Sequence, residues 1–112
     1  MQPKEFKHIM KREGRYHCYC GGIETKKDRL SCHHIISIRD GGKLVLWNCA
    51  LIARKNHDKF NLIERKLPLI AEYMNNSFLE YIHTGNYAIV KENKRILQKY
   101  YPRAKQLVKR RK

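Results

Sequence analysis

A chain of 112 residues with 42% hydrophobic residues is long enough for one domain with a modest core. Its 25 lysine and arginine residues against 10 acidic residues give a formal net charge of +15, which predicts a polyanionic partner, with nucleic acid favoured over an anionic membrane. No apolar run reaches the ~18 residues of a membrane span, and MQPKEFKHIM lacks a signal-peptide core, so we expect a cytoplasmic protein with reduced cysteines and no membrane partner.

Hydrophobic periodicity and turn residues divide the chain into short elements. In chain order, the expected elements are a helix at Pro3–Arg12, a strand at Leu30–Ile38, a turn at Asp40–Gly42, a return strand at Lys43–Trp47, a helix at Ala50–Glu64, an interruption or new start at Pro68, a helix at Leu69–His83, a short strand or link at Tyr87–Val90 and a helix at Glu92–Tyr101. The tail after Pro102, RAKQLVKRRK, contains six basic residues and no acid. The sequence therefore predicts an α+β protein whose centre runs strand, turn, strand, helix.

Four polar residues stand at suggestive positions in this central unit. The stretch CHHIISIRDGG places His33 and His34 side by side on the first strand. Adjacent residues on a strand point to opposite faces, so the two imidazoles are expected to be aimed differently. Asn48 follows at the entry to the expected helix, and His57 lies within that helix. A ββα unit can bring all these side chains around one point.

Together with WNCALIARKNHDKFN (residues 47–61), this stretch resembles the HNH endonuclease motif, also called the ββα-metal or His-Me finger motif. The resemblance covers roughly Gly14 to Asn61. It implies a single domain over residues 1–112, with a ββα-metal core at 14–61 after a short N-terminal helix, a helical extension at 62–101 and a basic tail at 102–112. Small stand-alone members of this family are common in phages, so the resemblance also implies a phage origin, with a phage or host protein as a conceivable partner.

The resemblance implies a DNA phosphodiester hydrolase that uses one divalent metal ion and no small-molecule cofactor. Mg²⁺ is the expected ion, with Mn²⁺, Ni²⁺ or Zn²⁺ as alternatives. His34 would be the general base and His33 a metal ligand, because one imidazole nitrogen cannot hold a metal and accept a proton from water. His57 would be the second ligand, and Asn48 would hold the loop and orient His34. Asn61, one helical turn past His57, is left open as a third ligand.

Many members of this family also carry a structural zinc held by two CxxC pairs. The corresponding positions here are His17 and Cys20 for the first pair, and Ala53 and Asn56 for the second. Because structural zinc needs four cysteine or histidine ligands, we expect none, and a zinc held by His17, Cys20 and another cysteine is left as the alternative. The cysteines expected to be buried reduced thiols are Cys18, Cys20, Cys32 and Cys49. The residues expected to hold the core by packing are Trp47, Phe60, Tyr73, Phe78 and Leu79.

The basic residues fall into a group around the motif and a group in the tail. The expected DNA-binding residues are Arg39, Lys43, Arg54, Lys55 and Lys59 around the motif, and Arg103, Lys105, Lys109, Arg110, Arg111 and Lys112 in the tail. The tail is either a phosphate clamp or a disordered arm, and no pattern for reading bases is present. Two other functions remain open: a catalytically weak or inactive HNH-scaffold protein that binds nucleic acid or inhibits an enzyme, and a protein-binding adaptor.

Overall fold

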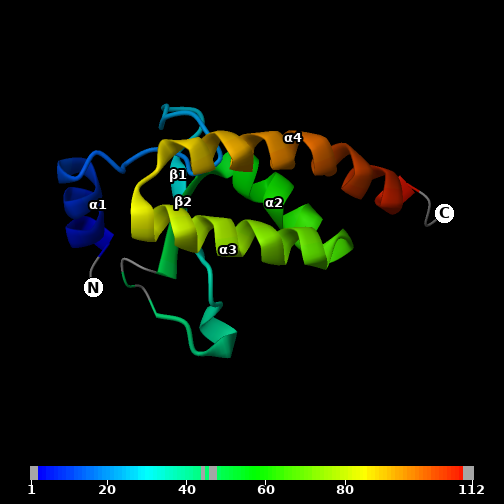
Figure 1. The fold of residues 1–112 in the computed structure, drawn as a ribbon, viewed down its shortest axis with the longest axis horizontal. Coiled ribbons are helices and arrows are strands. Elements are labelled where there is room, and N and C mark those ends of the chain that lie inside the picture. Colours follow the sequence, from blue (N-terminus) through cyan, green and yellow to red (C-terminus); the bar gives the residue numbers. More distant parts are fainter. Residues whose placement is uncertain (1–2, 44, 46–47, 110–112) are drawn as a thin grey trace.

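The computed structural model describes residues 3–43, 45 and 48–109 (Figure 1). Its elements are α1 (Pro3–Arg12), β1 (Leu30–His34), the 3-10 helix η1 (Ile38–Asp40), β2 (Cys49–Ala53), α2 (Arg54–Lys66), α3 (Pro68–Thr84) and α4 (Tyr87–Lys109). The two strands form an antiparallel sheet that leads directly into α2. This arrangement confirms the predicted α+β class with a ββα core. None of the described helices is long and apolar enough to cross a membrane.

The strand boundaries differ from the prediction. β1 ends at His34, which pairs with Cys49, and Leu30 pairs with Ala53 at the other end of the sheet. The return strand is therefore CALIA, most of which the sequence assigns to a helix; all its side chains are buried, and a short apolar run fits either element. Within the predicted return strand, Lys43 and Val45 are not in a strand, and residues 44, 46 and 47 lie outside the described residues.

The last helix is longer than predicted. α4 runs without a break through Tyr87–Val90 and continues past Pro102, so the predicted link is wrong, and a disordered arm is wrong for residues 103–109. Proline removes a backbone donor and bends a helix, yet Ala104 beyond it is fully buried, and this packing keeps the segment helical. Figure 1 shows α3 and α4 side by side and antiparallel, with the C-terminal end of α4 reaching away from the sheet.

The core lies between the sheet and the three long helices. Phe60 of α2, Phe78 of α3 and Val90 of α4 have no exposed surface, which confirms the first two as core residues. Tyr73 is 57% exposed, because the buried positions of α3 are Ala71, Met74, Phe78 and Tyr81, and Tyr73 falls beside that stripe. Leu79 is half-buried, and the expected core residue Trp47 lies outside the described residues.

A buried amide joins α3 and α4 to the segment before the sheet. Asn93 has no exposed surface, and its Nδ2 donates to the backbone oxygen of Tyr19 at 2.9 Å. Its Oδ1 accepts a hydrogen bond from Ser77 Oγ at 2.6 Å. A buried amide without partners would cost about 1–3 kcal/mol, so these bonds fix how the helical extension sits on the ββα core.

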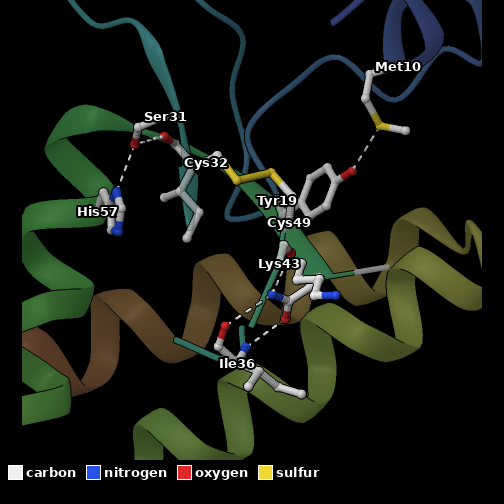
Figure 2. The surroundings of a disulfide bond; sticks show 10 residues. Met10, Tyr19, Ser31, Cys32, Ile36, Lys43, Cys49 and His57 are labelled. Carbon is white, nitrogen blue, oxygen red and sulfur yellow. Dashed lines mark hydrogen bonds between the residues drawn. A yellow bond between two sulfur atoms is a disulfide. The ribbon is translucent and has the colours of Figure 1, made fainter. Parts of the chain in front are cut away.

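The two cysteines of the sheet are not reduced thiols, contrary to the prediction. Cys32 of β1 and Cys49 of β2 form a disulfide (Figure 2). They lie diagonally across the strand pair, since Cys32 pairs with Leu51 and Cys49 with His34. Their Cα atoms are 5.5 Å apart, a separation common for bonded cysteines. A helix over residues 50–64 gives no reason to expect this proximity, which arises only from the strand pairing.

Cys18 and Cys20 are free and buried, as predicted. The Sγ of Cys18 accepts hydrogen bonds from the backbone N–H of Ala53 at 3.2 Å and from Asn56 Nδ2 at 3.5 Å. Ala53 and Asn56 are the positions that correspond to the second CxxC pair of the family. A buried sulfur therefore links the turn at residues 18–22 to the beginning of α2.

The loop between the strands closes around Asn48, which has no exposed surface. Its Oδ1 accepts from the backbone N–H of Ile36 at 2.7 Å, and its Nδ2 donates to the backbone oxygens of Ile36 and Lys43, each at 3.0 Å (Figure 2). Gly42 passes so close that a Cβ there would lie 1.7 Å from the Ile36 oxygen. Only glycine fits at this position, which accounts for the second glycine of the Gly-Gly turn.

Replacing Cys18 by serine should flatten the pH dependence of stability above neutrality. A hydrogen bond from the Cys20 thiol, together with the Ala53 and Asn56 donors, lowers the pKa of Cys18 to about 6, against about 8.5 for a thiol in an unfolded chain. Because the folded pKa is the lower one, the stabilisation grows as pH rises from about 6 to about 8.5 and is lost as pH falls through about 6. Urea denaturation of both proteins at about pH 7 and pH 8.5 measures it, because both proteins contain the same histidines and their titration cancels in the comparison. Equal rises in unfolding free energy would contradict a Cys18 thiolate.

Replacing Gly42 by alanine should destabilise the loop, because the methyl group must displace the Ile36 carbonyl. We expect a loss of about 1–3 kcal/mol in the free energy of unfolding and faster hydrogen exchange at the Ile36 amide. The matched control is Gly41→Ala, where φ is +89° but no atom lies within 4 Å of the added Cβ. That variant should show backbone strain while Ile36 stays protected. Equal protection of Ile36 in both variants would show that the close approach does not matter.

Candidate functional site

A cleft of about 790 Å³ lies where β1 ends, between the loop that follows it and helices α2 and α3. Its lining includes His33, His34, Arg39, Asn61, Glu64 and Asn75. Three elements distant in the sequence therefore meet here: the end of β1, the middle of α2 and the middle of α3. The cleft is therefore lined both by predicted site residues and by residues that the sequence did not indicate.

His33 is held in the wall of this cleft by neighbours on several sides. Its side chain is buried, and its ring centroid lies 4.6 Å from that of Phe60 and 6.0 Å from that of Phe78. Its Nε2 lies 2.8 Å from Oδ1 of Asn75. An amide oxygen only accepts hydrogen bonds, so Nε2 carries the proton and Nδ1 keeps the lone pair.

His57 lies beside His33, with ring centroids 5.4 Å apart and the rings nearly perpendicular. Its Nδ1 lies 2.7 Å from Ser31 Oγ, and Figure 2 shows the two side chains pointing toward each other. The Ser31 hydroxyl donates its one proton to the backbone oxygen of Ile52 at 2.9 Å. The hydroxyl must then accept from His57, which places the proton on Nδ1 and leaves the lone pair on Nε2.

Both rings are neutral at physiological pH. Burial lowers the pKa of His33, and the nearby His34 lowers it further, while the hydrogen bond to Asn75 acts in the opposite direction. Burial also lowers the pKa of His57, and the neighbouring His33 adds to this effect. Two neutral imidazoles side by side, each with one nitrogen already hydrogen-bonded, are the state in which histidine binds a metal ion.

His34 differs from His33 in its surroundings, as expected for its neighbour on a strand. It is half-buried and lines the cleft at the end of the sheet. Among the residues that the structure describes, none forms a hydrogen bond with the His34 imidazole. The amide of Asn48 is hydrogen-bonded to Ile36 and Lys43 and not to the His34 ring, and the backbone oxygen of Asn48 accepts from Ile35 N–H at 3.0 Å. Asn48 thus fixes the backbone directly after His34.

Two residues of α2 form one wall of the cleft, whereas His57 of the same helix is not among the residues that line it. Asn61 and Glu64 follow His57 at helical spacing, and both line the cleft. Within residues 3–43, 45 and 48–109, no three histidine, cysteine or acidic side chains gather as a metal site.

The predicted basic residues do not all lie at the cleft. Arg39 lines it, whereas Lys59 lies on another side of α2, in a groove that also includes Lys94 and Tyr101 of α4. The ammonium group of Lys59 lies 5.3 Å from the Tyr101 ring centroid. Lys43, Arg54 and Lys55 are exposed, as are Arg103 and Lys105; the side chain of Lys109 and residues 110–112 lie outside the described part.

Sequence reasoning missed three residues of the site. Glu64 could have been found from its spacing of seven residues after His57, which places it on the same helix face. Ser31 lies two residues before His33 and so on the same face of the strand, which was a weaker signal. Nothing in the sequence marked Asn75, because a helix of unknown orientation gives no reason to prefer it to Asn76.

Comparison with protein families matches residues 18–61 to the HNH endonuclease family. No curated protein and no solved structure showed a significant match to the chain. The matched segment contains β1, β2 and the first part of α2, together with the histidine pair, Asn48 and His57. It indicates a nuclease or another function related to nucleic acid. Residues 18–61 are therefore similar to the HNH endonuclease family over the segment in which the motif resembles it.

Proposed function

We propose that this protein is a metal-dependent endonuclease that hydrolyses DNA phosphodiester bonds at the cleft beside β1. The observation that supports this best is the pair of neutral, adjacent imidazoles of His33 and His57 next to His34. HNH nucleases typically use a divalent metal ion, and the donor set fits one. His33 and His57 would hold it, and Asn61 could add an oxygen ligand. When bound, the cation would neutralise negative charge on the scissile phosphate.

The residues of this chain would divide the remaining work. His34, free of hydrogen bonds from described residues, would take a proton from the attacking water. Asn48 would keep the backbone after His34 in one conformation, so that the imidazole stays directed toward the cleft. Arg39, in the lining of the cleft, would bind a phosphate close to the bond being cut. Of these residues, His34 and Arg39 line the cleft, and Asn48 holds the loop that follows β1.

Binding of the DNA backbone would extend beyond the cleft. α4 carries lysine and arginine along its length and a single glutamate, and tyrosines lie among these charges. Arg103 and Lys99 lie over the ring of Tyr100, and Lys105 lies over that of Tyr101. Such side chains would hold phosphates without reading bases, which accords with a formal net charge of +15.

Replacing His34 by alanine should lower the rate of plasmid cleavage by about 10²–10⁴-fold, the usual contribution of a general base. The fold, metal affinity and DNA affinity should be retained, because His34 makes no metal bond and packs little core. The measurement is the conversion of supercoiled plasmid with Mg²⁺, Mn²⁺ or Ni²⁺, and with EDTA, alongside circular dichroism. The matched control is His83→Ala, an exposed histidine on α3.

Wild-type cleavage rates in folded His34→Ala protein would falsify the assigned role. If the wild-type protein binds DNA but cuts it with none of these metals, the alternative of an inactive HNH-scaffold binding protein replaces the nuclease.

Replacing Arg103 and Lys105 by glutamine should weaken DNA binding for all sequences alike and reduce its salt dependence. The slope of log K against log salt should fall by about 0.9 for each phosphate that the variant no longer neutralises. Truncation is a poorer test, since it would remove Ala104, which is buried in the helix packing. Lys26→Gln, a loss of charge in the exposed loop before β1, is the control. An unchanged slope in the α4 variant would exclude this part of α4 from the interface.

A further inference from the structure

A side chain of the helical extension, Asn75, is hydrogen-bonded to His33. Asn75 lies in the middle of α3, beyond the segment that matches the HNH family. It lines the cleft, and its Oδ1 lies 2.8 Å from Nε2 of His33. The buried stripe of α3 includes Met74 and Phe78, and Asn75 lies at the edge of that stripe where the helix meets the cleft. Its neighbour Asn76 is exposed.

We infer that Asn75 is a positioning residue for His33, fixing by its amide oxygen the tautomer in which Nε2 carries the proton and Nδ1 offers the lone pair to a divalent cation. This inference rests on the proposed function only for the identity of the ligand. An imidazole buried beside Phe60 and Phe78 could rotate or exchange tautomers, and either change would move the lone pair. A single acceptor at fixed distance removes this freedom, because only a protonated Nε2 can donate to it.

His57 also has a hydrogen-bond partner that determines its tautomer. Ser31 accepts from Nδ1 of His57 and so leaves the lone pair on Nε2, the opposite nitrogen from that of His33. The two rings are adjacent. The hydrogen bonds to Asn75 and Ser31 therefore determine which nitrogen of each ring remains available for a shared ligand. Partners of this kind typically change metal affinity by about 10–100-fold when removed. Asn75 would therefore matter to metal binding without touching the metal.

The first test reads the tautomer directly in the metal-free protein. In ¹⁵N-labelled wild type, two-bond ¹H–¹⁵N correlation spectra at neutral pH should show His33 with a protonated Nε2 and an unprotonated Nδ1. A protonated Nδ1 would overturn the inference, whatever the variants do. This readout needs neither metal nor cleavage activity, so it remains decisive even if the proposed nuclease function fails.

The second test uses substitutions at Asn75. Asn75→Leu removes the acceptor, and His33 should then show mixed tautomers and bind Mn²⁺ about 10–100-fold more weakly by calorimetry. Asn75→Asp keeps an acceptor oxygen and should restore the wild-type tautomer. Asn76→Leu, the same substitution at the exposed neighbour, should match wild type in both measurements, while circular dichroism monitors the fold.

An Asn75→Leu protein with the wild-type His33 tautomer and Mn²⁺ affinity would overturn the inference, as would an Asn75→Asp protein with mixed tautomers. If Asn75→Leu does not fold, the Asp variant and the wild-type spectrum decide. If wild type has the stated tautomer but binds no divalent ion, the metal site of the proposed function fails and Asn75 does not position a metal ligand.

Discussion

The site depends first on the buried side chain of Asn48. This amide accepts one hydrogen bond and donates two, which hold Ile36 at the beginning of the loop and Lys43 further along it, so β1 can stop directly after the histidine pair while the chain still returns in register. The loop closes so tightly that Gly42 has no room for a Cβ. A backbone held in this way keeps the two histidines at the rim of the cleft instead of continuing the sheet past them.

Because of this constraint, the consecutive residues His33 and His34 have different surroundings. The ring on one face of β1 enters a pocket of aromatic side chains, where burial favours the neutral form and every polar atom needs a partner. The ring on the other face remains half-buried at the cleft. The fold thus provides a rigid imidazole and a more accessible one from adjacent positions, which suits one to holding a ligand and the other to exchanging a proton. Ser31 of the sheet and Asn75 of the helical extension are the hydrogen-bond partners of the His57 and His33 rings, respectively.

The sequence was informative where a residue type and its spacing together imply a chemistry. The histidine pair, Asn48 and His57 were identifiable in this way, as was the ββα order. The boundary between β2 and α2 was not, because CALIA carries no periodicity when all its faces are buried. Pro102 suggested a helix end, but the packing of Ala104 outweighs the local cost of proline. Asn75 could not be predicted as a site residue, because the choice between two adjacent asparagines depends on how α3 is rotated about its axis against the core.

The hydrogen bond between Asn93 and Tyr19 limits how the motif could be moved into another protein. Residues 18–61 contain the family motif, but their first turn is hydrogen-bonded to α4, and Phe78 of α3 packs beside the ring of His33. Excised and fused to another protein, that segment would lack these supports and expose Phe60, which has no exposed surface in the intact chain. The segment that matches the family is therefore shorter than the segment needed to bury its core, and a designed chimera would need to carry the helical hairpin of α3 and α4 along with the motif.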